Sequence, residues 1–268
     1  MVSSERWRFQ KHLFIVTMLA VVAGYSDVIS VIRFNAFASL MTGNVVFLCR
    51  LVLDPQLGEH HTFWFYICVC LSFFAGSFIQ RLCELHRPNR GGSIASVPLA
   101  VLMLLGEMAF FASGLSWQEV HLDWTVVAVA MLFGVVASSC VGGRTGTHTT
   151  MVSGHILTLG GLVANFSFNQ YLSPEERGKM MLSFLVIAGT IAGAMFGAWA
   201  VANCNEHILL FPVPVALVIL LFLHDHLAKP RSFIKKVQNH LRAHSPSNSQ
   251  DEANTSESES VDEKSDTM

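Results

Sequence analysis

Long apolar runs separated by short polar connections dominate the chain up to residue 225. Six of these runs are long enough to cross a bilayer core of roughly 30 Å as helices: they are residues 12–32, 63–82, 94–114, 122–142, 180–202 and 206–225. Two further runs, 38–53 and 149–164, hold about 16 residues each, near or below the usual spanning length. The pattern predicts an all-α integral membrane protein with six transmembrane helices and two shorter segments.

The composition supports this interpretation. Hydrophobic residues fill 52% of the 268 positions and charged residues only 13%, whereas about a quarter of the residues in a soluble domain are charged. The spans use most of the length, which leaves no room for a separate soluble catalytic domain. The six cysteines show neither metal-ligand nor disulfide-framework spacing. We therefore expect the lipid bilayer as a partner, and neither a metal, a cofactor nor nucleic acid.

Lysine and arginine are unevenly distributed over the connections. If only the six long runs cross, most of these residues fall on one side: Arg6, Arg8, Lys11, Arg81, Arg87, Arg90, Arg144, Arg177, Lys179, Lys229, Arg231, Lys235, Lys236 and Arg242. Only Arg33 and Arg50 fall on the other side. Because basic residues favour the cytoplasmic face, both termini are predicted to be cytoplasmic, with the plasma membrane as the default location. The distribution requires 38–53 and 149–164 to return to the side they left, so both are predicted to be re-entrant half-helices.

The chain also aligns with itself at a shift of 111 residues. This shift places Met41-Thr42-Gly43-Asn44 over Val152-Ser153-Gly154-His155, Arg33 over Arg144, and 94–114 over 205–225. The two units, 12–114 and 122–225, have the same order of elements and an odd number of crossings each. The second unit therefore enters the membrane in the opposite direction, which predicts a 3+3 inverted repeat. Inverted repeats with broken helices characterise secondary transporters and some channels.

Several motifs resemble a known family. Ala23-Gly24-Tyr25-Ser26-Asp27-Val28-Ile29, Phe37 and Met41-Thr42-Gly43-Asn44-Val45-Val46-Phe47-Leu48 are similar to the signature of the YoaK-like family of multipass membrane proteins, a domain-of-unknown-function family. Thr149-Thr150-Met151-Val152-Ser153-Gly154 and Leu157-Thr158-Leu159 resemble its second signature, whereas Ser138-Ser139-Cys140 departs from the Gln-Asn-Ala type of sequence expected there. The resemblance covers residues 12–225 and implies six spans, but no settled substrate.

Two carboxyl groups lie inside predicted spans. Asp27 is deep in the first span, beside Tyr25, Ser26 and Ser30, and Glu107 is in the middle of the third. An ionisable group there costs at least about 2.5–3.5 kcal/mol on insertion scales, which makes it a candidate functional residue. Both groups are candidates for binding a proton in a coupled carrier. The structural alternative is a hydrogen-bonded pair that caps the broken helix.

Arg33 and Arg144 occupy equivalent positions just before the two half-helices. A guanidinium group binds carboxylate or phosphate through two parallel hydrogen bonds, so the pair points to a small anion. The alternative is that each arginine extends to the membrane interface or pairs with a carboxylate such as Asp27 or Glu107.

The starts of the two half-helices supply the remaining candidate residues. These are Thr42, Gly43, Asn44, Ser153, Gly154 and His155. Hydroxyl and amide side chains bind the free N–H groups of a helix start, and glycine allows close backbone approach. Asn44 and His155 are candidates for direct contact with a solute, and His155 also for proton relay. The alternative is that all six serve the packing of the half-helices.

The remaining segments have their own predictions. Residues 1–11 form a cytoplasmic N-terminus, 229–242 a basic amphipathic helix on the membrane surface, and 243–268 a disordered acidic tail. Pro212 and Pro214 are expected to kink the last span.

The first hypothesis is a secondary carrier that moves a small polar or anionic solute between the two repeats, with proton coupling left open. The alternatives are an aquaporin-like channel, a membrane enzyme and a non-transporting membrane scaffold. Because no nucleophile elbow, phosphate-binding loop or His-rich metal motif is present, an enzyme is not expected. A homo-oligomer is left open.

Overall fold

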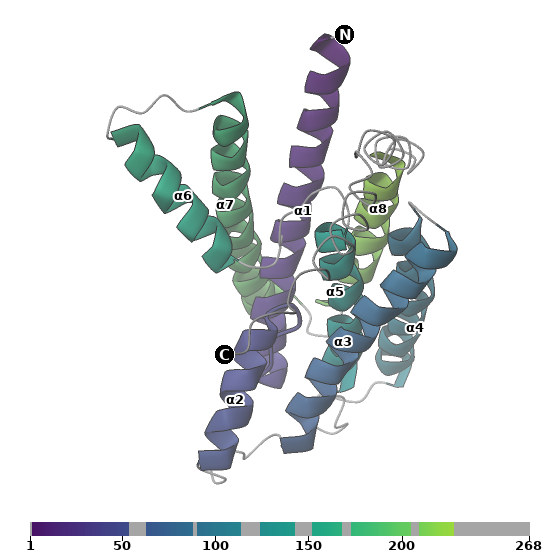
Figure 1. Ribbon diagram of the computed structural model, residues 1–268. Helices are drawn as coiled ribbons and strands as arrows, with labels where there is room; N and C mark the ends of the chain where they lie inside the picture. Colours follow the sequence, from purple (N-terminus) through teal and green to yellow (C-terminus); the bar gives the residue numbers. More distant parts are fainter. Residues whose placement is uncertain are drawn as a thin grey trace, which may run out of the picture. The chain divides into compact units, whose positions relative to one another are not determined.

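The computed structural model describes residues 2–53, 63–87, 90–113, 124–142, 152–167, 173–204 and 209–227. The predictions for Arg144, for 229–242 and for the tail at 243–268 lie outside this part of the chain. Within it the protein is all-α, with eight helices and no strand (Figure 1). They are α1 (Val2–Phe34), α2 (Met41–Leu53), α3 (Phe63–His86), α4 (Gly91–Ser113), α5 (Trp124–Gly142), α6 (Val152–Ser167), α7 (Pro174–Asn203) and α8 (Pro212–Leu227).

Several of these helices are long and apolar enough to cross a membrane. Four meet the length and hydropathy expected of a span: Phe9–Phe34, Phe63–His86, Gly91–Ala109 and Pro174–Asn203. Three more stretches, Met41–Leu53, Thr125–Val141 and Pro212–His226, are apolar but shorter. Many large apolar side chains on these helices are exposed, as they are where a protein surface faces lipid. The protein is an integral multipass membrane protein.

Local sequence explains where the helices begin and end. Ser173 starts α7 with a capping box, in which its hydroxyl accepts the Glu176 N–H at 3.2 Å and its own N–H donates to the Glu176 carboxylate at 2.7 Å. Pro174 follows in the first turn, where a missing N–H costs nothing. Asn35 ends α1 in a left-handed conformation with φ 47°, which asparagine tolerates better than most residues.

One boundary overturns a prediction. The last helix begins at Pro212 instead of residue 206, so Pro212 and Pro214 lie in its first turn. Proline is well suited to that position because its fixed φ matches the helix and its absent N–H would have no intrahelical partner. The expected kink of the last span at these prolines is therefore wrong, because the helix starts at them.

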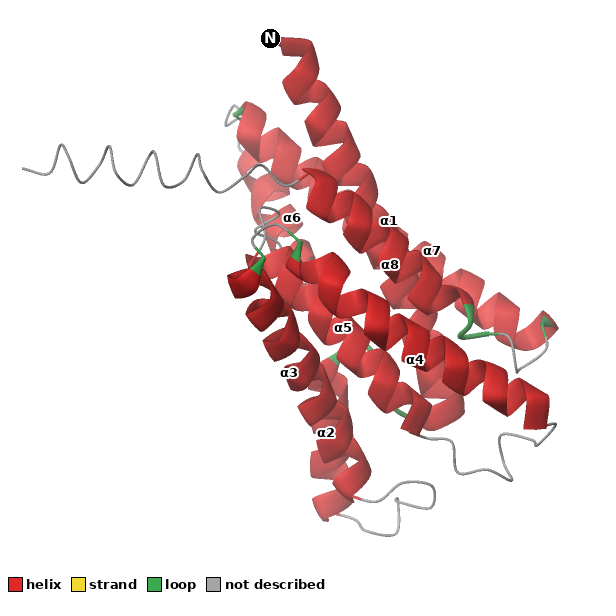
Figure 2. Cartoon of the chain, turned by 90° about the vertical axis from the view of Figure 1, so that its right-hand side faces the viewer, coloured by secondary structure: helices red, strands yellow, loops and turns green. Residues whose placement is uncertain are grey.

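The helices pack in a small number of pairs. The most extensive contacts join α1 to α7 and α3 to α5, and α4 also packs on α8 (Figures 1 and 2). The short helix α2 packs on α3, and α6 packs on α7. Fully buried apolar side chains such as Phe133, Leu217 and Leu221 form the main core.

Glycine sets the distance between the two helix backbones in both of the most extensive pairs, α1 with α7 and α3 with α5. A Cβ atom at Gly193 in α7 would collide with the carbonyl oxygen of Val21 in α1, and one at Gly76 in α3 would collide with that of Met131 in α5. Only glycine allows backbones to approach so closely, a device that membrane helices use because packing must replace the hydrophobic effect.

The two short helices run toward opposite ends of the bundle. In Figure 1, α2 ends at the lower end of the view, where α3 begins, and α6 ends toward the upper end, where α7 begins. Each short helix starts near the middle of the bundle in the same view. Their first turns, with unpaired backbone N–H groups, therefore need polar partners at that depth.

Candidate functional site

Asp27 holds the start of α2 from within α1. Its carboxylate accepts the backbone N–H of Ser39 at 2.7 Å and the Ser39 hydroxyl at 2.6 Å. The N–H groups of Ala38 and Leu40 also interact with it. The first N–H groups of a helix lack intrahelical partners and favour an anion. The carboxylate therefore holds the turn that leads into α2, at residues 38–40. The hydrogen-bonded pair of Asp27 and Glu107 expected as the structural alternative does not form, because neither Glu107 oxygen has a hydrogen-bond partner among the described residues.

The signature around Asn44 organises the connection between α1 and α2. Asn44 is fully buried, its amide oxygen accepts the Phe37 N–H at 2.8 Å, and its amide nitrogen donates to the Phe37 carbonyl at 2.7 Å. Gly43 lies under the Phe37 ring, where a Cβ atom would collide with ring carbons. Thr42 is exposed. The described contacts of Gly43 and Asn44 therefore hold the turn that brings the chain back toward α1.

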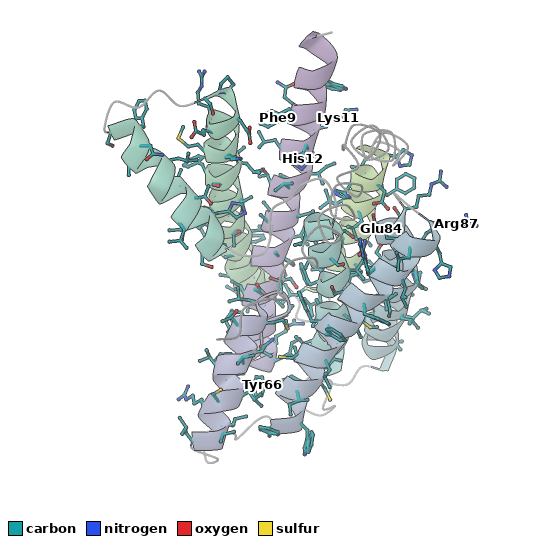
Figure 3. The ribbon with its side chains drawn as sticks, viewed as in Figure 1. Phe9, Lys11, His12, Tyr66, Glu84 and Arg87 are labelled. Atoms are coloured by element: carbon teal, nitrogen blue, oxygen red, sulfur yellow. The ribbon has the colours of Figure 1, made fainter. Side chains whose placement is uncertain are left out.

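A further hydrogen bond fixes this turn to the next span. The Tyr66 hydroxyl of α3 donates to the Asn35 carbonyl at 2.9 Å, and Figure 3 labels Tyr66 near the lower end of the bundle. Its ring also lies 5.9 Å from that of Phe47 in α2, measured between centroids. The start of α2 is thus held by groups from both neighbouring spans.

Arg33 of α1 and Glu107 of α4 lie within range of each other's charge. The Glu107 side chain is 3% exposed, and neither of its oxygens has a hydrogen-bond partner among the described residues. The Arg33 guanidinium lies close enough for its charge to act on both Glu107 and the Tyr25 hydroxyl. A buried carboxyl without a hydrogen bond is costly, so this one needs a proton, a positive charge or a ligand.

Two serine hydroxyls continue the polar row from Arg33. Ser26 and Ser30 are fully buried, and neither hydroxyl has a hydrogen-bond partner among the described residues. Positions 26, 30 and 33 share one face of a helix. Beside them, the Tyr25 hydroxyl is satisfied by the Leu209 carbonyl at 2.7 Å. One face near the end of α1 therefore carries two buried hydroxyls without a hydrogen-bond partner among the described residues, in line with Arg33.

The second motif makes different contacts. His155 is 6% exposed, and its Nδ1 lies 3.1 Å from the Ser183 hydroxyl of α7. Ser153 and Gly154 are exposed, and the space around a Cβ atom at Gly154 is open. Asp27 and Asn44 thus hold the turn before α2, and Arg33 lies within range of the Glu107 charge. No contact between Thr42 and Ser153 occurs among the described residues.

Sequence reasoning missed two polar clusters that tie helices together. Gln80 of α3, 1% exposed, accepts the Ser138 hydroxyl of α5 at 2.6 Å and donates to Glu84 at 2.9 Å. Asp225 of α8 accepts the N–H of Ser93 at 2.8 Å and also its hydroxyl, and so caps the start of α4. A lone glutamine within an apolar span and a Gly-Gly-Ser helix start were the available signals.

No group of three or more metal-ligating side chains occurs in the described ranges.

A family model matches most of the chain. It is described as "Protein of unknown function (DUF1275)" and covers residues 15–222, which confirms the resemblance found in the motifs. No curated protein and no solved structure matches the chain.

Proposed function

Since the chain belongs to the DUF1275 family, a multipass membrane family of unknown function, we propose that it is a secondary carrier for a small anionic or polar solute that travels with a proton. The observation that carries the proposal is Glu107, a buried carboxyl that has no hydrogen-bond partner among the described residues and lies within range of the Arg33 charge. Ionisable groups buried between membrane helices commonly mark the path of a solute or a proton.

The pairing of helices supports two repeats of opposite sense. The sequence shift makes α1 equivalent to α5, α2 to α6, α3 to α7 and α4 to α8. Under these equivalences three contact pairs have counterparts: α1 on α7 matches α5 on α3, α2 on α3 matches α6 on α7, and α1 on α8 matches α5 on α4. The contact of α3 with α4 has no comparable counterpart between α7 and α8 in the described ranges. The shared pairs include the two most extensive contacts of the protein, which supports the repeat.

The close approaches within the two extensive pairs support the same arrangement residue by residue. Gly24 against the Thr190 carbonyl matches Gly134 against the Phe73 carbonyl, and Gly193 against that of Val21 matches Gly76 against that of Met131. Between α1 and α5, one offset in residue number relates both Gly24 to Gly134 and Val21 to Met131. Between α3 and α7, a second offset relates both Phe73 to Thr190 and Gly76 to Gly193. These crossings are surfaces at which one repeat can rock against the other, as in alternating access.

The chemistry of the Arg33 and Glu107 pair suggests how solute and proton are coupled. Without solute, the Glu107 carboxylate is the anion next to the guanidinium. An incoming carboxylate or phosphate competes for the same donors, because a guanidinium fork fits either group. Two anions cannot share the site cheaply, so solute binding requires Glu107 to take up a proton. Anion and proton then cross together, and both leave when the site opens to the other side.

Asp27 supplies a second proton-sensitive contact in this proposal. As a carboxylate it accepts several N–H and O–H groups at the start of α2. A protonated carboxyl accepts fewer hydrogen bonds and no longer complements the positive end of the helix. Protonation would therefore release α2 from α1 and allow the short helix to move as the site changes sides.

Uptake into proteoliposomes tests the proposal. We expect saturable uptake of radiolabelled lactate, succinate or inorganic phosphate that an inward proton gradient drives. Glu107→Gln should abolish the effect of the gradient, Arg33→Gln should abolish uptake, and Asp27→Asn should weaken coupling. Glu175→Gln is the matched control, because Glu175 is 79% exposed and pairs with Lys179 on the surface. Flux that never saturates, or uptake that Glu107→Gln leaves unchanged, would contradict a coupled carrier.

A further inference from the structure

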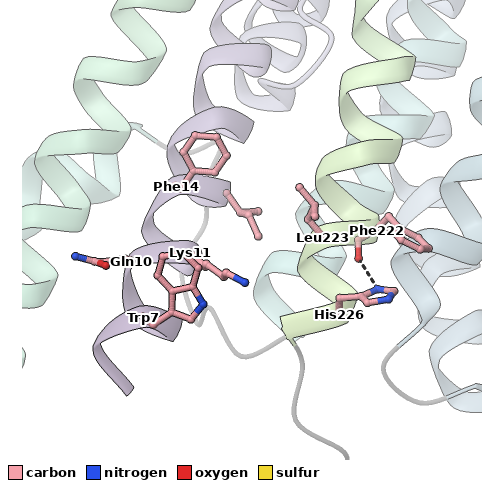
Figure 4. Close-up of a pocket in the computed structure, with 8 residues that line it drawn as sticks. Trp7, Gln10, Lys11, Phe14, Phe222, Leu223 and His226 are labelled. Carbon is pink, nitrogen blue, oxygen red and sulfur yellow. Dashed lines mark hydrogen bonds between the residues drawn. The ribbon is translucent and has the colours of Figure 1, made fainter. Parts of the chain in front are cut away.

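A cavity of about 650 Å³ lies between the first turns of α1 and the last turns of α8 (Figure 4). The residues that line it are Trp7, Gln10, Lys11, Phe14, Ile15, Phe222, Leu223 and His226. This cavity is distinct from the Arg33 and Glu107 pair, which lies at the opposite end of α1. Its volume falls within the range of pockets that hold small molecules.

The polarity of the cavity changes along the helix axes. Lys11 and His226 lie near the end where α1 begins and α8 stops, whereas Phe14, Ile15 and Leu223 lie farther inside the two apolar stretches. Lys11 and Ile15 are one helical turn apart, about 6 Å along the axis. Trp7 lies on the outer side of Lys11, as tryptophan does at the boundary between membrane and water. The cavity therefore runs from the headgroup level into the hydrocarbon.

The outer end of the cavity is cationic. The Lys11 ammonium lies over the Trp7 ring, 4.7 Å from its centroid, and none of the eight lining residues is acidic. His226 uses Nδ1 to contact the Phe222 carbonyl at 3.1 Å, which leaves Nε2 for another partner. The neighbouring carboxylate, Asp225, is engaged by Ser93 of α4. A positive group that has no acidic neighbour among the residues lining this cavity complements an anion.

The inner part of the cavity is complementary to a hydrocarbon chain. Phe14 and Phe222 are 57% and 53% exposed, so the groove between them is open to the surrounding lipid. An acyl chain in this groove would cover apolar side chains from both helices. A soluble anion would leave that part of the cavity unfilled.

We propose that this cavity binds one anionic phospholipid, with its phosphate beside Lys11 and His226 and one acyl chain between α1 and α8. Such a lipid would fix the start of the first span against the end of the last one. Basic residues near a membrane surface recognise anionic headgroups in the same way.

Native mass spectrometry of the full-length protein, released from detergent with phosphatidylglycerol or phosphatidylcholine, tests this site. We expect phosphatidylglycerol adducts to exceed phosphatidylcholine adducts, and Lys11→Gln to weaken phosphatidylglycerol binding about fivefold. Lys179→Gln is the matched control, because that lysine is already paired with Glu175 at 2.8 Å. Equal retention of both lipids, or equal effects of the two substitutions, would overturn the proposal.

A second pair of variants tests the apolar part of the cavity. Leu223→Trp adds bulk inside the groove and should reduce phosphatidylglycerol binding, whereas Val215→Trp, on an exposed part of α8 outside the cavity, should not. An excess of glycerol phosphate, which carries the headgroup chemistry without acyl chains, should not compete. Competition by glycerol phosphate would show that the site binds a soluble anion. Phosphatidylglycerol binding that Leu223→Trp leaves intact would show that the lipid binds elsewhere.

Discussion

Asp27 binds Ser39 through both of its carboxylate oxygens, one accepting the backbone N–H at 2.7 Å and the other the hydroxyl at 2.6 Å. Ser39 lies two residues before α2, and Asp27 lies two turns before the end of α1. The chain therefore turns back along α1 before the short helix starts. This hydrogen-bonded pair determines the depth at which α2 begins.

The first prediction concerns the strength of this contact. Ser39→Ala removes the hydroxyl donor and should lower the free energy of unfolding by about 1–2 kcal/mol. Asp27→Ala should cost more, about 3 kcal/mol, because it leaves several N–H groups without an acceptor. Unfolding in detergent micelles by added SDS measures both. Ser167→Ala, which removes only an exposed hydroxyl bonded to the Val163 carbonyl, should change stability by less than about 0.5 kcal/mol. Equal effects of the three alanine variants would contradict the role of Asp27 in holding the turn before α2.

The second prediction concerns the glycine crossings and has opposite signs at two kinds of site. Gly76→Ala and Gly193→Ala place a methyl group against a backbone carbonyl and should each destabilise the protein by about 1–3 kcal/mol. Gly106→Ala and Gly161→Ala place it in open space and should be neutral or should stabilise by up to about 1 kcal/mol, since alanine is the better helix former. The same unfolding assay measures all four variants. If Gly106→Ala destabilised the protein as much as Gly76→Ala, the close approach of the helices at Gly76 would not be what limits the size of the residue there.

The third prediction compares equivalent positions in the two repeats. Asn44 forms two hydrogen bonds with the backbone of Phe37 in the turn, whereas His155 contacts a side chain, the Ser183 hydroxyl of α7. Asn44→Ala should therefore cost about 2–3 kcal/mol and His155→Ala about 1 kcal/mol. Hydrogen exchange should also report faster exchange in the first turn of α2 for the Asn44 variant. If His155→Ala were the more damaging change, the role assigned to Asn44 in the turn would be wrong.

Much of the fold follows from hydrophobic patterning. Each predicted span and each predicted short segment coincides with a helix, because long apolar runs have few alternatives in lipid. The exact ends do not follow from that pattern. The first helix begins at Val2, since nothing in the polar residues before the span breaks a helix, and the last begins at Pro212 because of the first-turn preference of proline.

The site was predictable in its parts but not in its pairings. Asp27 and Glu107 are conspicuous as charges in apolar runs, and the sequence allows the two to be hydrogen-bonded to each other. The partner of Asp27 is instead Ser39, which only the tight turn at Asn35 brings within reach. Likewise, Glu107 is separated from Arg33 by two whole helices in sequence, and only the tertiary packing brings it within range of the Arg33 charge.

The central claim is that two repeats insert in opposite directions and that α2 and α6 are half-helices that do not cross. In that case Leu53, at the end of α2, and Ser167, at the end of α6, face opposite sides of the membrane. If both helices crossed, the two residues would face the same side.

The most direct measurement labels single cysteines at these two ends. Leu53→Cys and Ser167→Cys would be made separately in a variant whose exposed Cys49 and Cys204 are serine, and treated in intact cells with a membrane-impermeant maleimide before and after permeabilisation. We predict that Leu53→Cys reacts in intact cells and Ser167→Cys only after permeabilisation. Labelling of both positions under the same condition would contradict the inverted repeat and the carrier mechanism built on it.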